Sequence, residues 1–272
     1  MPDQLNRFTF DHTDVRGQQV RLEATWQAAL ERVDYPEPVR RVLGELMAAA
    51  VLLTGTLKFE GTLKLEARGE GPLTLAVVQA GHDGHVRGLA RWEDGLPDSD
   101  HLSELMGENG QFVLTLEPAA EDQQRYQGIV GLEDETVAGV LEDYFARSEQ
   151  LATRLWLAAD GERAAGLLLQ RLPDRNSDDP DAWERTTTLA DTLKDEELLG
   201  LPAEQVLTRL FHEEPVRVYD PVPVSFRCTC SADKVGGMLR GLGVEEVRSV
   251  LAEQGEVRVD CEFCGRPYVW DA

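Results

Sequence analysis

Cys228-Thr229-Cys230 and Cys261-Glu262-Phe263-Cys264 are the stretches of this sequence that decide how its C-terminal part folds. They hold all four cysteines of the 272-residue chain. In a C-x-C motif, residues i and i+2 of an extended segment point to the same face, and in C-x-x-C the two thiols flank a tight turn. Two such pairs, brought together by the segment between them, can place four sulfurs at the corners of a tetrahedron, which suits Zn²⁺. The spacing therefore predicts one metal site, and oxidants can link the same sulfurs into disulfides.

The sequence around the cysteines predicts a small α+β unit over residues 222–272. Few of its side chains are large and apolar, and in a unit of roughly 50 residues a metal often has to supplement the core. Structural Zn²⁺ contributes about 10–16 kcal/mol in small Cys-rich modules, whereas whole domains have a net stability of only about 5–15 kcal/mol. Loss of the metal is therefore expected to unfold this unit. The expected elements are a strand over 222–227, a helix capped by Ser231 that runs towards Leu239, a helix between Gly243 and Gly255, and strands over 256–260 and 267–270.

Residues 1–173 read as an α+β domain in which a mixed or antiparallel sheet packs against helices. Alternation of apolar and polar residues favours strands, and Pro38 is placed to start a helix that continues to Thr54. A second helix is expected at about 136–148. The expected strands are 7–10, 18–22, 63–67, 73–78, 86–92, 111–116, 126–130, 154–158 and 166–172.

Residues 174–221 form an acidic connector with apolar residues at helical spacing. From residue 173 to residue 215 there are 12 acidic and 4 basic residues, a net charge of −8. Like-charge pairs such as Asp181/Glu184 and Asp191/Asp195 destabilise an isolated helix by about 0.2–0.5 kcal/mol each. Because most helical stability comes from packing an apolar face, these helices are expected to need a docking surface, and the connector is predicted to be metastable.

The overall charge argues against partners that are themselves anionic. The chain has 27 basic and 50 acidic residues and a formal net charge of −23. Such a surface repels phosphate backbones and anionic lipid, so we expect neither nucleic acid nor membrane as a partner. The first residues do not resemble a signal peptide, and no stretch approaches the ~20 apolar residues that span a bilayer. A cytoplasmic protein is the expectation, in which clustered cysteines indicate metal or redox use.

Segments beyond the cysteine motifs match a known family over nearly the whole chain. Residues 222–227 precede the first motif as Val-Pro-Val-Ser-Phe-Arg, and Val244-Glu245-Glu246-Val247 precedes the second. The similarity continues upstream through residues 211–214, 166–173, 144–150, 71–73 and 43–46. With these segments and its paired motifs, the chain resembles the 33-kilodalton heat-shock protein family, the redox-regulated holdase chaperones. Gly265-Arg266 departs from the family pattern in the turn after Cys264 and leaves the metal ligands unaffected.

The resemblance implies a switch between two states. In the reduced, inactive protein, one Zn²⁺ per chain would be held by Cys228, Cys230, Cys261 and Cys264. Oxidation would pair Cys228 with Cys230 and Cys261 with Cys264, release the metal, and unfold the C-terminal unit and the connector. The resemblance further implies that the oxidised protein forms a homodimer and holds unfolding client proteins without ATP, with residues 1–173 as the substrate-binding domain.

Two other functions remain open on the residues alone. The four thiols could form a permanent zinc module in a binding or scaffold protein, since Cys₄ sites are usually structural. A thiol-disulfide enzyme is less favoured, because there C-x-x-C opens a helix, whereas Gly265 and Pro267 follow Cys264 here. The glycines form no phosphate-binding loop and no G-x-S-x-G elbow, so no enzymatic activity is expected.

Overall fold

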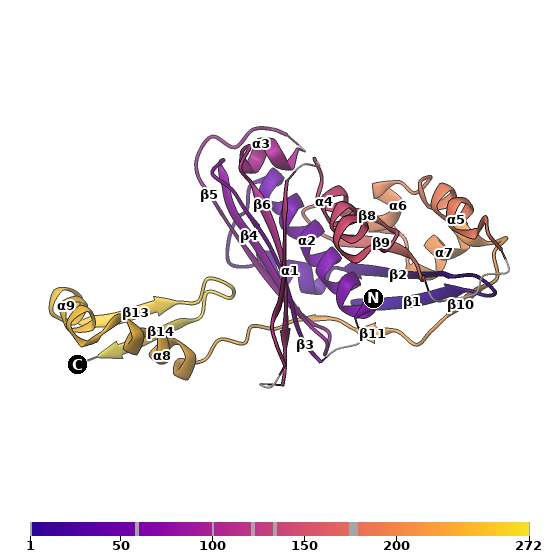
Figure 1. The fold of residues 1–272 in the computed structure, drawn as a ribbon. Coiled ribbons are helices and arrows are strands. Elements are labelled where there is room, and N and C mark those ends of the chain that lie inside the picture. The colour runs from indigo at the N-terminus through magenta and orange to yellow at the C-terminus, as the bar shows by residue number, and fades with distance from the viewer. Residues whose placement is uncertain are drawn as a thin grey trace. The chain divides into compact units, whose positions relative to one another are not determined.

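The computed structural model describes residues 2–57, 60–99, 101–120, 123–132, 135–173 and 179–271. Its contacts divide the chain into two compact units, Met1–Phe226 and Arg227–Ala272. Figure 1 shows the elements of both. No helix in the described ranges is both long and apolar enough to cross a bilayer.

Two sheets form the first unit, each with six strands among the described residues. Sheet A has the order β10-β1-β2-β9-β8, with β11 also paired to β1. Sheet B has the order β12-β5-β4-β3-β6-β7. All pairings are antiparallel except β12 with β5, so the expectation of an α+β fold with a mixed sheet is confirmed. The strands of sheet A are β1 (Gln4–Phe10), β2 (Val15–Leu22), β8 (Thr153–Ala159), β9 (Ala164–Arg171), β10 (Val216–Val218) and β11 (Val222–Pro223). Those of sheet B are β3 (Gly61–Arg68), β4 (Leu73–Gly81), β5 (His85–Trp92), β6 (Gln111–Pro118), β7 (Tyr126–Gly131) and β12 (Ser225–Phe226).

Helix α2 (Glu37–Thr56) lies between the two sheets and contacts strands of both (Figure 1). Pro38 stands in its first turn, as predicted, where a missing N–H costs no hydrogen bond. The helix is apolar on nearly every side, and residues such as Leu43, Leu46 and Leu52 are fully buried. Such a pattern is typical of a helix enclosed by protein. The main core of the unit is therefore the double interface on either side of α2. The other helices of this part are α1 (Ala24–Leu30), α3 (Leu102–Met106), α4 (Val137–Tyr144) and the π-helical turn η1 (Phe145–Glu149).

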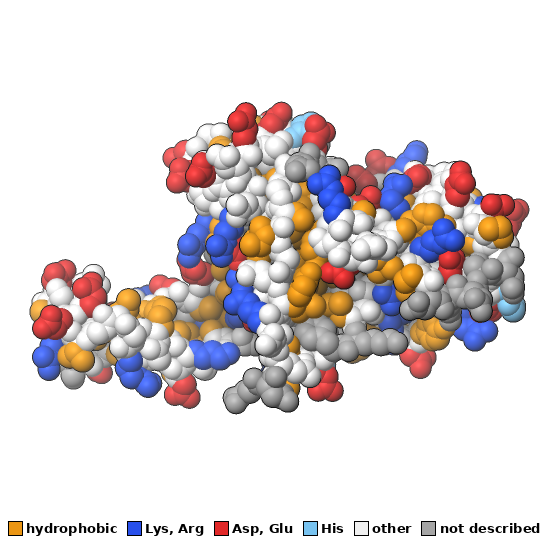
Figure 2. Space-filling model, viewed as in Figure 1, with side chains coloured by type: hydrophobic (Ala, Val, Ile, Leu, Met, Phe, Trp, Pro, Cys, Tyr) orange, Lys and Arg blue, Asp and Glu red, His pale blue; other side chains and the backbone are white. Residues whose placement is uncertain are grey.

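In the described part of the connector, residues 179–221, three helices lie over the outer face of sheet A (Figure 1). They are α5 (Ala182–Ala190), α6 (Asp195–Gly200) and α7 (Ala203–Phe211). A second hydrophobic cluster joins them to the sheet, in which the Phe211 ring lies 5.0 Å from that of Phe10 and 6.0 Å from that of Phe8, centroid to centroid. Figure 2 shows acidic side chains on the outer surface of these helices. The helices expected in the connector thus pack their apolar sides against sheet A, which provides the docking surface.

The second unit is a β-hairpin with two helices. Strands β13 (Glu256–Asp260) and β14 (Pro267–Asp271) pair antiparallel, and α8 (Ala232–Leu242) and α9 (Val244–Gln254) precede them. Ser231 caps α8, because its hydroxyl accepts a hydrogen bond from the Lys234 N–H at 3.2 Å, and Gly255 ends α9 in the left-handed conformation. Both helix ends agree with the sequence prediction.

Sequence reasoning missed three elements and merged two others. Helices α1 and α3 are short, and β10 has three residues, so none carries a periodic signal over enough positions. The strand expected over residues 222–227 is instead two strands of two residues each, and these pair with different sheets. The helix expected at about 136–148 passes into the π-helical turn η1 after Tyr144. In each of these cases, contacts with parts of the chain that are distant in sequence determine the observed structure.

Candidate metal centre

All four cysteines meet at one end of the β13–β14 hairpin. Cys261 and Cys264 belong to the loop that joins the two strands, and Cys228 and Cys230 lie on the extended segment before α8. Their ligand atoms all lie within 4.8 Å of one another. In the part of the chain that the structure describes, this is the one group of three or more His, Cys, Asp and Glu side chains placed to hold a metal ion. The structure thus brings together the four cysteines that the sequence singled out as candidate metal ligands.

The hairpin loop is shaped by backbone hydrogen bonds around Cys261. Its carbonyl accepts hydrogen bonds from the N–H of Cys264 at 3.3 Å and of Gly265 at 2.6 Å, and its own N–H donates to the Arg266 carbonyl at 3.0 Å. Gly265 has φ = 64°, in the left-handed region where a side chain is strained. The glycine in this turn, which departs from the expected family pattern, therefore suits the backbone that aims both thiols to one side.

The sulfur positions fit a tetrahedral ion. Two pairs cross between the motifs: Cys228 Sγ to Cys261 Sγ is 3.6 Å, and Cys230 Sγ to Cys264 Sγ is 3.5 Å. With a Zn–S bond of about 2.3 Å, the edge of a regular tetrahedron of sulfurs is about 3.8 Å. The cluster is therefore close to the size that Zn²⁺ requires. All four are free thiols in the structure.

The environment of Cys261 and Cys264 disfavours their thiolate forms. Burial raises the pKa of the Cys264 thiol to about 12, and its contacts with the other three thiols act in the same direction. Burial also raises the pKa of Cys261. Without a cation, the thiols of Cys261 and Cys264 would therefore keep their protons at neutral pH, whereas a divalent cation stabilises bound thiolates. The raised thiol pKa values and the clustered geometry both favour a metal site over a reactive nucleophile.

Two side chains outside the motifs support the site, and the sequence analysis did not single them out. The Tyr268 hydroxyl donates to Cys230 Sγ at 3.1 Å, and Lys234 Nζ donates to the Thr229 carbonyl at 2.9 Å. Tyr268 faces the sulfurs because it lies on β14 directly opposite Val259, near the loop end of the hairpin. Strand pairing could have revealed this contact, but the spacing of the cysteines could not.

The unit that carries the site has almost no apolar core. Val257 is its one buried hydrophobic side chain in the described range, and neither α8 nor α9 buries any residue. Met238, Leu242 and Val244 are each more than half exposed. The small apolar core that the sequence predicted is thus present, and it is typical of units that a metal or disulfides help to stabilise.

Comparisons with known proteins agree with one another. The family model described as "Hsp33 protein" matches residues 3–271. A curated protein from Chromobacterium violaceum named 33 kDa chaperonin is 51% identical over 269 residues, which are 99% of this chain and 91% of the relative. A 33 kDa chaperonin from Neisseria meningitidis serogroup A is 50% identical over 271 residues, with 99% and 89% covered. The crystal structure of the 33 kDa chaperonin from Thermotoga maritima is similar in fold, with a TM-score of 0.84 at 23% identity over 99% of this chain and 94% of that one.

Proposed function

Because this chain belongs to the Hsp33 family, whose curated relatives are named chaperonins, we propose that it is a redox-regulated holdase that binds unfolding proteins without ATP. The observation that carries the proposal is the cluster of four thiols in a unit with almost no apolar core. A covalent change at the sulfurs then controls a folding equilibrium. A sequence with a larger core around the site would not respond in this way.

In the reduced state, Cys228, Cys230, Cys261 and Cys264 would hold one Zn²⁺, and the protein would be inactive. When bound, the ion supplies about 10–16 kcal/mol of folding free energy and keeps the sulfurs as thiolates. The sequence of this unit offers little apolar burial to replace that contribution. The folded unit and the bound metal therefore depend on each other.

Oxidation would form two disulfides, Cys228 with Cys230 and Cys261 with Cys264. Each bond forms when one sulfur, oxidised by peroxide to a sulfenic acid, is attacked by its neighbour, so that one H₂O₂ accepts two electrons and yields two waters. Disulfide sulfurs are poor metal ligands, so the site loses its Zn²⁺. Both disulfides close very short loops, which constrain the unfolded chain only weakly and do not restore the fold.

Unfolding would then spread to the connector, which we assign to residues 174–221, between a substrate-binding domain at 1–173 and the switch at 222–272. Helices α5–α7 cover apolar side chains of sheet A, among them Phe8, Phe10 and Leu169. Release of the connector exposes both its own apolar face and this part of the sheet. These surfaces are the proposed contacts for clients, and for the second chain of an oxidised homodimer.

Cytoplasmic residence follows from the same chemistry. Thiols of this kind stay reduced in the cytosol, where glutathione and thioredoxin act, so that an oxidant is needed to start the switch. The net charge of −23 keeps nucleic acid and anionic membranes from competing with clients.

The decisive experiment follows zinc, thiols and chaperone activity in the same samples. Reduced, zinc-loaded protein is treated with peroxide at elevated temperature, after which released zinc, free thiols and the aggregation of a thermolabile client are measured. We expect zinc release and disulfide formation to precede suppression of aggregation. If the metal and the fold survive verified oxidation, or if activity is equal before and after it, a constitutive zinc module in a binding protein is the better description.

A further inference from the structure

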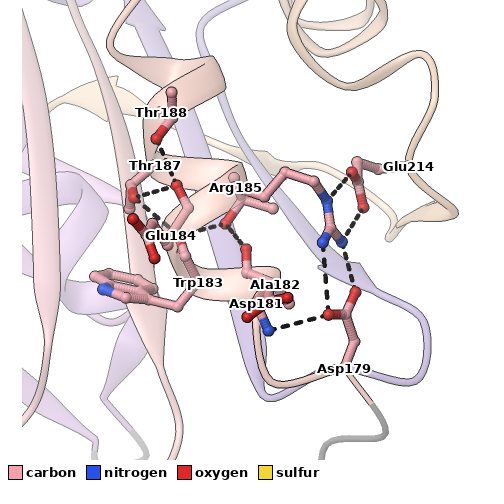
Figure 3. Close-up of polar contacts among 10 residues, drawn as sticks. Asp179, Asp181, Ala182, Trp183, Glu184, Arg185, Thr187, Thr188 and Glu214 are labelled. Atoms are coloured by element: carbon pink, nitrogen blue, oxygen red, sulfur yellow. Dashed lines mark hydrogen bonds and ion pairs between the residues drawn. The ribbon is translucent and has the colours of Figure 1, made fainter.

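One arginine binds two carboxylates at opposite ends of the connector (Figure 3). Arg185 Nε donates to Glu214 Oε1 at 2.7 Å, and Arg185 Nη2 donates to Glu214 Oε2 at 3.1 Å. The same Nη2 donates to Asp179 Oδ2 at 2.6 Å. Asp179 also accepts a hydrogen bond from the Asp181 N–H at 3.1 Å, at the start of α5. We call Arg185, Asp179 and Glu214 the Arg185 clamp.

The Arg185 clamp joins the segment before α5 to the segment after α7. Asp179 precedes α5, whereas Glu214 follows α7 and stands two residues before β10. The Glu214 side chain is 8% exposed, so its charge is largely removed from water and depends on the guanidinium. Arg185 likewise lowers the pKa of Asp179 through its hydrogen bond. The contact therefore joins the first and last parts of the connector through a paired, partly buried charge.

The segment between the clamp and the metal centre is attached to the first unit by very short strands. Going back from Arg227, it contains β12, β11 and β10, with two, two and three residues. Val224 is buried, but the ion pair along this stretch, Arg217 with Asp11, lies at the surface. Short elements with few buried contacts open at low free energy, so loss of structure that starts at the metal centre can pass along them. The Glu214 side chain is the first charged group along this path that is largely shielded from water.

We propose that the Arg185 clamp stops local unfolding that begins at the metal centre, so that this unfolding does not reach helices α5–α7. This inference rests on the proposed function and names the contact that keeps the connector docked. Loss of the metal frees the second unit and β10–β12, and the connector stays docked on sheet A until the clamp also breaks. Arg185 is thus a positioning residue for the connector.

The physical reason is that Glu214 and Asp179 both bind the same guanidinium. Removing the guanidinium leaves Glu214 buried without a partner and close to a second carboxylate, which is strongly unfavourable. Lysine keeps the charge but cannot donate two parallel hydrogen bonds to Glu214 while also reaching Asp179. Arg185→Met and Arg185→Lys should therefore weaken the clamp to different extents.

The connector also offers a matched control. Arg209 on α7 pairs with Glu197 at 2.5 Å and donates to the Thr192 carbonyl at 3.1 Å, with its side chain 35% exposed compared with 40% for Arg185. Its partners lie on and before α6, inside the connector, so it does not join the two ends. Arg209→Met removes the same charge from the same segment. A general electrostatic effect would make the two variants alike.

Amide hydrogen exchange on the full-length, reduced protein tests the proposal, with zinc bound and after removal by a chelator. In the wild type, chelation should speed exchange in the second unit and β10–β12 and change α5–α7 by less than about twofold. In Arg185→Met, chelation should speed exchange in α5–α7 by at least about tenfold, as expected when hydrogen bonds to charged groups are lost. Arg185→Lys should fall between these values, and Arg209→Met should behave like the wild type.

Two outcomes would overturn the clamp. One is a wild type whose α5–α7 open together with β10–β12 on chelation, and the other is equal exchange in Arg185→Met and Arg209→Met. Native protection of β3, β4 and β9 in zinc-loaded Arg185→Met would show that this variant is folded. If Arg185→Met does not fold, the same measurement is made on Arg185→Lys instead. Exchange does not depend on chaperone activity. A clamp that works in a protein without oxidant-dependent activity would leave this inference standing and reject the proposed function.

Discussion

The two units of this molecule are stabilised in opposite ways. In Met1–Phe226, helix α2 is enclosed by two sheets and the connector covers a third apolar interface, so that side chains as large as Trp26 and Phe112 are fully buried. In Arg227–Ala272, neither of the two eleven-residue helices has a buried residue. The four cysteine sulfurs lie together in this unit, in place of an apolar core. Burial of apolar surface does not respond to oxidants, whereas thiolate–metal bonds do. A chain built in this way can lose one unit on a chemical signal and keep the other.

Removal of one metal ligand should give the largest effect and should be confined to the second unit. Cys261→Ser leaves three thiolates, which bind zinc less well. The few apolar contacts present cannot replace the folding free energy of about 10–16 kcal/mol that a bound structural Zn²⁺ supplies. We expect β13 and β14 to lose exchange protection in the reduced variant, while the strands around α2 keep theirs. Thr229→Ala, inside the first motif but without a ligand atom, is the control.

Protease digestion and exchange on the same variant decide whether the comparison holds. A Cys261→Ser protein that binds no zinc and yet keeps a protected hairpin would show that the second unit has a core of its own. A variant that loses protection around α2 as well would show that the two units are not independent.

Truncating one leucine in each unit should sharpen the contrast. Leu207 on α7 is 5% exposed in the interface with sheet A, whereas Leu242 at the end of α8 is 58% exposed. Leu207→Ala should destabilise connector docking by about 2–5 kcal/mol and lower the oxidant or temperature needed for activation. Leu242→Ala should change stability by less than about 0.5 kcal/mol. Urea unfolding and the activation midpoint of both variants measure this, and equal effects would remove the distinction between a docked and an exposed apolar side chain.

The same contrast explains what could be predicted from the sequence. The clustering of the four cysteines and the ends of α8 and α9 depend on local signals, namely cysteine spacing, Ser231 and Gly255, and the structure has the cluster and both helix ends as predicted, whereas the role of the cysteines as metal ligands stays a prediction. Strands with clear alternation, such as β3 and β5, were also found. The division of the first unit into two sheets around α2 was not foreseen, because pairing between distant strands leaves no local signal. Arg185 was missed for the same reason: its partner Glu214 is 29 positions away.

A carboxyl on α2 should make the first unit sensitive to pH. Burial raises the pKa of Glu45 from 4.5 to about 7, with Arg41 opposing the shift and Asp195 of the connector adding to it. The pKa is higher in the folded than in the unfolded state, so this stabilisation is fully present below about pH 4.5 and is lost as pH rises through 7. Between pH 6 and pH 8 the loss should be roughly 1.4 kcal/mol. The difference in urea unfolding between wild type and Glu45→Gln isolates this group from the histidines and cysteines, and a difference that is the same at both pH values would contradict the prediction.

The smallest expected effect concerns the cap next to the metal ligands. Ser231 follows Cys230 directly, and its hydroxyl accepts from the Lys234 N–H at the start of α8. Ser231→Ala should cost about 0.5–2 kcal/mol, because one N–H of the first turn loses its acceptor. Ser249→Ala is the matched control, since that hydroxyl only donates to the exposed Glu253 side chain at 3.3 Å. In a unit with an apolar core, such a loss would stay within α8. Here the helix start and the sulfurs share one short segment, so Ser231→Ala should also speed zinc transfer to a chelator, whereas Ser249→Ala should not. Equal transfer rates for the two variants would mean that the metal site holds its geometry without help from the helix.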